Sequence, residues 1–319
     1  MTRFLTNKRF WLFAPFVALF GLAVMAFGLW HYAGARISEE MAARGISWQN
    51  LQRHGFPARL SFDLEGARFQ EGPIGWENDA LSITLMPFQG GHAIADFHGP
   101  HRLTTQGQSL HLSHSGNLAS LIVDSDGPVR ASFEAQKPEA SLRIGGLERV
   151  FAAQEMSLHA RRSDTVEAID VAMTTRQVSL PAQWGRGAKS LITRFDMRAT
   201  LPETVLLGAA RAGQKISLER VTLQRNGLTL VARGTLKLAS SGYLAGKLDI
   251  DAIKLQALLD LLQEFDVVSA RDRAKWLFLG GLGAAFGGTT QDRLSVPLQF
   301  RNERVFLGPL ELGAAPRWR

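Results

Sequence analysis

The sequence predicts a mostly β protein of the β-rich α+β class. An N-terminal transmembrane helix precedes a long antiparallel sheet, curled or folded into a sandwich, and a few C-terminal helices follow. Residues 10–33 carry no charged side chain and are long enough to cross a hydrocarbon layer of about 30 Å as a helix. Most of the remaining chain alternates apolar and polar residues in short runs, which is typical of strands with one buried face. Residues 253–265 change to a helical period.

The basic residues around the apolar segment predict a topology. Three of them lie within residues 1–9, whereas Arg36 alone follows the segment closely. Basic residues are enriched on the cytoplasmic side of membrane spans. We therefore expect a cytoplasmic N-terminus over residues 1–9, a single-pass anchor over residues 10–33, and the bulk of the chain across the membrane.

A cleaved signal peptide is the alternative to an anchor. The small residues Ala33-Gly34-Ala35 resemble a peptidase site, but the apolar core exceeds the roughly 7–15 residues of a signal sequence. Trp11 at one end, and Trp30 and Tyr32 at the other, are placed as interfacial aromatic belts. We favour the uncleaved anchor, and the alternative stays open at this point.

Composition excludes several kinds of site. The chain has no cysteine, which excludes disulfides and cysteine-based zinc or nucleophile chemistry. Its formal charge of +7 could attract anionic headgroups, although ordinary solvated strands explain it better. Most basic residues stand singly among acidic ones, so we expect no nucleic-acid partner. Neither a G-x-S-x-G motif nor a Walker loop occurs, and we expect no catalytic residue, no cofactor and no enzyme.

The chain after the anchor divides into three predicted regions. Residues 34–54 are predicted as a helix that links the anchor to the domain, and the following Gly55-Phe56-Pro57 ends it. Residues 55–200 form a first β-rich region, and residues 201–319 form a β-meander with C-terminal helices. The apolar strand positions that alternate most clearly are Leu60, Phe62, Leu64, Leu81, Ile83, Leu85, Leu110, Leu112, Val129, Phe133, Ile169, Val171, Met173, Phe195 and Met197.

The C-terminal region carries the strongest local signals. Asn226-Gly227 predicts a type I′ hairpin, and a last hairpin is expected around Asn302-Glu303. Helices are expected over residues 201–213, 253–265 and 269–286, the first and last from capping-box patterns. The helix at 253–265 has one leucine stripe, so it should pack on the sheet.

Three motifs resemble a known family. They are Gly55-Phe56-Pro57-Ala58-Arg59-Leu60, the segment Ala95–Leu103 (ADFHGPHRL) and the closing segment Phe306–Gly313 (FLGPLELG). Together they resemble the domain-of-unknown-function family 2125 of Gram-negative bacteria, over most of the chain. In a Gram-negative bacterium the topology expected above corresponds to an anchor in the inner membrane with the bulk of the chain in the periplasm, and no catalytic residue is carried over from the family.

A second similarity covers the block from Leu218 to Leu262. Its order of strand, hairpin, glycine turn, strand and leucine-rich helix is similar to the C-terminal part of AsmA-like envelope proteins. Those proteins are membrane-anchored, face the periplasm and are linked with lipid traffic, so the similarity implies a phospholipid or another lipid as partner.

Histidines are concentrated between residues 92 and 114. The pairs His98/His101 and His111/His114, with Asp96, have spacings that a metal site could use. However, residues three apart on a strand point to opposite faces. We expect structural roles and no metal, with Gly99 and Pro100 forming a structural turn. Asp249 and Asp251 share a strand face, where we expect solvated charges rather than an acid pair.

The apolar strand faces are the candidate binding site. Few helices are predicted to cover them, so either they pack into an ordinary core or they line a groove for an acyl chain. An ordinary core is the more common outcome. The candidate groove-lining residues are Phe62, Leu64, Leu81, Ile83, Leu85, Leu228, Leu230 and Leu248.

These observations favour a membrane-anchored periplasmic protein that is not an enzyme and that binds or guides lipid in envelope maintenance. The alternative is a structural or assembly partner of another envelope protein, which would bind through exposed sheet edges. An enzyme is a distant third.

Overall fold

The computed structural model describes residues 10–72, 74–86, 91–105, 108–144, 147–164, 167–181, 191–206, 211–264, 293–308 and 310–317. The chain divides into two compact units, unit 1 over Met1–Gln106 and unit 2 over Gly107–Arg319. The predicted boundary between residues 200 and 201 instead falls inside the strand β13 (Leu191–Pro202), which pairs along its length with strands on both sides. The predicted class, mostly antiparallel β with an N-terminal apolar helix, is confirmed.

Unit 1 begins with the long helix α1 (Phe10–Ala43). The helix runs without a break through the apolar segment and nine residues past Gly34, because the polar residues there lie on one side and Ile37 and Met41 on the other. Gly45, with a φ of +82°, follows its end. The predicted helix over residues 34–54 is therefore wrong beyond Ala43. That stretch pairs with the sheet instead.

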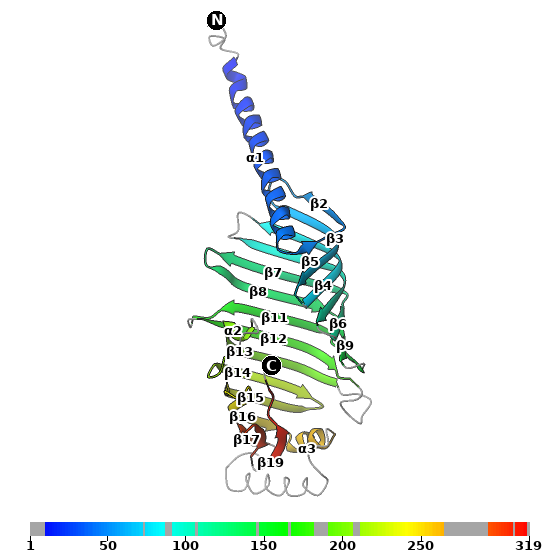
Figure 1. Ribbon diagram of the computed structural model, residues 1–319, viewed down its shortest axis with the longest axis vertical. Helices are drawn as coiled ribbons and strands as arrows, with labels where there is room; N and C mark the ends of the chain where they lie inside the picture. The colour runs from blue at the N-terminus through cyan, green and yellow to red at the C-terminus, as the bar shows by residue number, and fades with distance from the viewer. Residues whose placement is uncertain are drawn as a thin grey trace. The chain divides into compact units, whose positions relative to one another are not determined.

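The strands of unit 1 pair antiparallel with their neighbours (Figure 1). The strand β3 pairs with β4 along its length and, on its other side, with both short strands, and β4 pairs with β5. The strands are β1 (Ile46–Ser47), β2 (Asn50–His54), β3 (Leu60–Glu71), β4 (Ile74–Met86) and β5 (His92–Thr105).

The core of unit 1 forms where α1 covers one face of this sheet. Phe62 and Leu64 are 0% and 1% exposed, and Leu81 is also buried. From α1, Ile37 and Met41 pack against this cluster. The C-terminal third of α1 is thus a covering helix for the sheet, whereas its N-terminal part exposes its apolar side chains.

Gly99 and Pro100 do not form the predicted turn. They lie within the continuous strand β5, at a β-bulge where Asn78 pairs with His101 and Ala80 pairs with His98. The φ of Gly99 is +118°, which a side chain rarely adopts. The buried Asn78 donates from Nδ2 to the carbonyls of both bulge residues, at 3.2 Å each.

The strands of unit 2 form one antiparallel sheet (Figure 1). Its main order is β7, β8, β11, β12, β13, β14, β15, β16, β17, β18 and β19, and β6, β9 and β10 pair beside it. The strands not yet bounded are β6 (Gln108–Ser113), β7 (Gly116–Asp124), β8 (Gly127–Gln136), β9 (Glu139–Ile144), β10 (Leu147–Ala152), β11 (Glu155–Arg162), β12 (Ala168–Ser179), β14 (Lys215–Arg225), β15 (Leu228–Leu238), β16 (Leu244–Ile253), β17 (Arg293–Arg301), β18 (Arg304–Leu307) and β19 (Leu310–Ala314).

The predicted hairpins are confirmed. Asn226 and Gly227 have φ angles of +48° and +81°, the two positive values that a type I′ turn requires, between β14 and β15. Asn302 and Glu303 turn between β17 and β18 with φ angles of +51° and +61°. Local turn chemistry therefore sets the register of this meander.

Two short helices belong to unit 2. The helix α3 (Leu255–Glu264) confirms the prediction over 253–265, and its buried Leu258 and Leu259 pack on Leu228 and Ala252. The helix α2 (Glu203–Leu206) is shorter than the predicted helix over 201–213, because residues 201–202 belong to β13 and residues 211–213 are not helical. The predicted helix over 269–286 lies outside the described residues.

Candidate functional site

Most of the candidate groove residues lie in packed cores. In unit 1, α1 covers Phe62, Leu64 and Leu81, and the partly buried Ile83 and Leu85 border the same cluster. The prediction of a groove is wrong for the three buried residues, because the lower part of α1 is an additional covering helix. Leu85 also lines a separate apolar pocket at the end of β4.

The candidate residues of unit 2 are packed in the same way. Leu228 is 2% exposed under α3, and Leu230 packs against that cluster. Leu248 is 6% exposed and packs with Leu236 and Phe300. The prediction of groove-lining roles is therefore wrong for Leu228 and Leu248. The leucine stripe of α3 and neighbouring side chains fill the space that a ligand would need.

The same face of unit 2 continues as an uninterrupted apolar surface away from α3. Directly opposed residues on successive antiparallel strands point to one face. One row of such residues, called here the apolar row, crosses eight strands from β8 to β17, or roughly 34 Å at about 4.8 Å per strand. Its members are Phe133, Leu158, Met173, Met197, Val221, Ala232, Ile250 and Val296.

The apolar row is less buried than a core. Leu158 is 38% exposed, and the other members are partly buried. Ala135, Val171 and Ala199, two positions along the strands from members of the row, are buried, but no described side chain of β8, β11, β12 or β13 belongs to the three clusters of buried core residues. Sequence alternation alone could not separate this surface from the core, because both have the same period of two.

The opposite face of the same strands is polar. The row next to the apolar row consists of Glu134, Ser157, Thr174, Asp196 and Thr222 in register. Thr174 on β12 donates a hydrogen bond of 3.0 Å to Asp196 on the neighbouring strand β13. The sheet is therefore two-sided, with one polar face and one apolar face.

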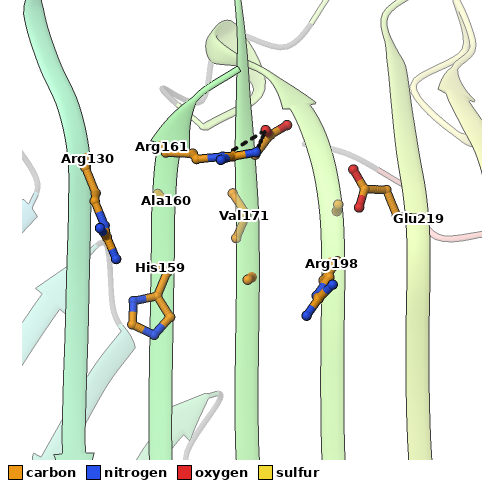
Figure 2. A pocket seen from close by; sticks show the side chains of 10 residues that line it. Arg130, His159, Ala160, Arg161, Val171, Arg198 and Glu219 are labelled. Atoms are coloured by element: carbon orange, nitrogen blue, oxygen red, sulfur yellow. Dashed lines mark hydrogen bonds and ion pairs between the residues drawn. The ribbon is translucent and has the colours of Figure 1, made fainter. Parts of the chain in front are cut away.

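A pocket of about 430 Å³ lies among charged side chains of β8, β11, β12, β13 and β14 (Figure 2). Arg161 donates from Nε and Nη2 to Asp170 on the neighbouring strand, both at 3.2 Å, as the dashed lines in Figure 2 show. Arg130, Arg198 and Glu219 also line it.

Asp170 is held ionised in this pocket. The hydrogen bond from Thr200, at 2.9 Å, lowers its pKa most, while partial desolvation opposes the shift and bonds from Ser163 and Arg161 support it. A carboxyl group with a lowered pKa is a poor general acid near neutral pH. His159 has a buried Nδ1 atom without a hydrogen-bond partner among the described residues. The arginines of this pocket could bind an anion, but Asp170 and Glu219 offset most of their positive charge.

The histidines of the predicted cluster have different surroundings. His101 is 4% exposed, and its Nδ1 accepts a 3.2 Å hydrogen bond from Trp76 Nε1, so it braces the sheet of unit 1. His98 is exposed and lies 3.7 Å from Asp96 through Nε2 and Oδ2. Within the described residues, no three histidine or acidic side chains are grouped so that they could hold a metal ion.

The remaining sequence candidates lie apart from the pockets. His111 lies on β6 and His114 follows that strand. Asp251 accepts from Ser295 at 2.7 Å and lies 3.5 Å from Arg233, whereas Asp249 lies 2.8 Å from Lys247. Both carboxylates thus have separate cationic neighbours.

The helix α1 is the one described helix that is long and apolar enough to cross a membrane. Its apolar side chains from Phe13 to Leu29 are exposed, with Phe20 at 73%. Length and composition alone support this assignment.

The comparisons with known proteins show the family. The sequence profile described as "Uncharacterized protein conserved in bacteria (DUF2125)" matches residues 34–316, so the chain belongs to this family. No curated protein and no solved structure matches the chain. The similarity to AsmA-like proteins is not shown by these comparisons.

Proposed function

We propose that this member of the DUF2125 family is a membrane-anchored, non-enzymatic envelope protein that binds or guides lipid along the apolar row of unit 2. The observation that carries the proposal is the partly exposed apolar face that continues across eight strands. A ligand that covers such a face must be long and apolar, and a lipid acyl chain has both properties.

The anchor supports lipid rather than another apolar ligand. A chain held at a membrane by α1 has phospholipid as its most abundant apolar neighbour. The opposite face of the sheet carries polar side chains, such as Thr174 and Asp196, and can face water. We also propose that residues 218–262 are similar to AsmA-like proteins. Because those proteins are linked with lipid traffic, this similarity agrees with a lipid-binding function.

A pair of arginine substitutions at adjacent positions tests the proposal. Met173→Arg places a charge on the apolar row, whereas Ala172→Arg places it on the opposite face. We expect purified Met173→Arg protein to carry less phospholipid than the wild type, and Ala172→Arg protein to carry the same amount, by lipid extraction and mass spectrometry. Lipid held around α1 is common to all three proteins, so the differences report the sheet.

A thermal melt must show that both variants fold. Equal lipid content in the three proteins would refute the proposal. A protein that co-purifies with the wild type and is lost from Met173→Arg would instead favour the assembly-partner function.

The proposed topology places α1 in the inner membrane with the N-terminus in the cytoplasm and the two units in the periplasm. A reporter that is active only in the periplasm, fused after Arg319, should be active. Mature protein that begins near Arg36 would contradict the anchor.

A further inference from the structure

Unit 1 contains an apolar pocket where α1 meets the sheet. Its volume is about 490 Å³, which lies within the roughly 300–1,000 Å³ range of small-ligand sites. One wall is the stretch of α1 from Ala26 to Ile37, and the other walls are formed by Phe56–Pro57 with Leu60, by Leu85–Met86 and by Gly91–His92. Because Leu29 is 62% exposed, the pocket is continuous with the exposed apolar surface of the helix.

Aromatic contacts hold one wall of the pocket in place. The ring of Phe56 lies edge-on to Phe27 at 5.4 Å and to Trp30 at 6.0 Å. Trp30 Nε1 donates a 2.9 Å hydrogen bond to the carbonyl of Arg59. Residues 55–60, which follow β2, are therefore held against α1 by these contacts. The pocket beside them is formed without a ligand.

Two basic residues lie near this part of α1. Arg59 follows the Phe56–Pro57 wall, and the Cδ atom of Arg53 lies 3.2 Å from where a Cβ atom on Gly34 would stand. Both arginines are exposed, and neither forms an ion pair with another residue that the structure describes. A guanidinium group matches the geometry of a phosphate group and binds it through two hydrogen bonds.

We propose that this pocket binds an acyl chain of an anionic phospholipid from the surrounding membrane, and that Arg53 and Arg59 bind its phosphate. The proposal rests on the proposed placement of α1 in the membrane. Trp30 and Tyr32 mark the headgroup level of a span, and the α1 wall of the pocket extends from Ala26 to Ile37 across this level, where acyl chains meet phosphates. The lining, which is apolar apart from His92, matches the chain, and the two arginines match the headgroup.

A pocket-filling pair tests the chain site. Ala26→Trp adds volume inside the pocket, whereas Val24→Trp adds it on α1 at a position that is 56% exposed and outside the pocket. The full chain in detergent, carrying Met173→Arg to remove lipid from the apolar row, is supplied with phosphatidylglycerol. Native mass spectrometry should show one bound lipid for the Val24→Trp protein and none for the Ala26→Trp protein. Met86→Trp, which fills the pocket from β4, is the second variant if Ala26→Trp does not fold.

A charge-neutralising pair tests the phosphate site. We expect the unsubstituted pocket to bind phosphatidylglycerol about tenfold more tightly than zwitterionic phosphatidylethanolamine, because two charge-assisted hydrogen bonds depend on an uncompensated anion. Arg53→Gln with Arg59→Gln should remove this preference and leave binding of the chain.

Three results would overturn the proposal: phosphatidylglycerol bound equally in Ala26→Trp and Val24→Trp proteins, equal affinity for the two lipids, or no bound lipid without pocket substitutions. The experiments test the two proposed lipid sites independently of each other. Sensitivity to Met173→Arg reports the apolar row, and sensitivity to Ala26→Trp reports the pocket under α1.

Discussion

Replacing Leu64 by alanine measures whether the buried strand face of unit 1 is a core or a ligand site. Leu64 is 1% exposed and packs in the cluster that α1 covers. Removing three buried carbons costs roughly 2.4 kcal/mol at about 0.8 kcal/mol per methylene, and the cavity left behind raises the loss to about 3–5 kcal/mol. For a unit of this size, such a loss lowers Tm by more than about 10 °C.

The matched control is Leu103→Ala in the same unit. Leu103 is 37% exposed on β5, so its truncation should change the free energy of unfolding by no more than about 0.5 kcal/mol. The assay is the thermal unfolding of full-length protein in detergent, followed by circular dichroism. Equal melting of Leu64→Ala and wild-type protein would refute the core assignment, because a ligand groove tolerates the loss of a lining side chain.

Three further predictions concern the bulge, the buried histidine and the pocket acid. Gly99→Val should lower stability by more than about 1 kcal/mol in a thermal melt, because valine is strained at a φ of +118°. His101→Ala should cost about 1–3 kcal/mol by removing a buried hydrogen-bond acceptor, whereas His98→Ala should have an effect within about 0.5 kcal/mol, both by denaturant titration. Thr200→Val should raise the pKa of Asp170 in an NMR titration, because it removes the hydrogen bond that lowers this pKa most. In the wild type the lowered pKa of Asp170 stabilises the folded state at pH values above the pKa of the unfolded chain. This stabilisation is lost as the pH falls through the pKa of the folded state.

The strands were predictable because a half-buried strand has a fixed signature. Each alternating run named from the sequence lies in a strand, from Leu60 on β3 to Met197 on β13. The Asn226-Gly227 turn was predictable for the same reason, since its two positive φ angles restrict the residues that can occupy it. Local physics therefore accounts for most of the secondary structure.

The covering contacts were not predictable from local patterns. Ile37 and Met41 mark an apolar helix face, but no local rule gives the sheet on which that face packs. Gly99 and Pro100 have the composition of a turn, yet pairing with β4 extends the strand through them as a bulge. Both features depend on tertiary partners that are distant in the sequence.

The sequence predicted an apolar strand face as the candidate site, but five of its eight residues are buried in packed cores, whereas Leu85 lines the apolar pocket of unit 1. Alternation is the same for Leu228, which α3 buries, and for Met173, which lies in the apolar row. The difference depends on where helices end and which strands they reach. The apolar row is therefore a finding of the structure.

Photocrosslinking in intact cells at two adjacent positions of β13 tests the central claim most directly. A photoreactive residue at Met197 faces the apolar row, and one at Arg198 faces the polar side. Lipid binding by unit 2 predicts a lipid adduct, identified by mass spectrometry, at position 197 and none at position 198. A protein adduct at position 197, or no adduct at either position, would contradict it.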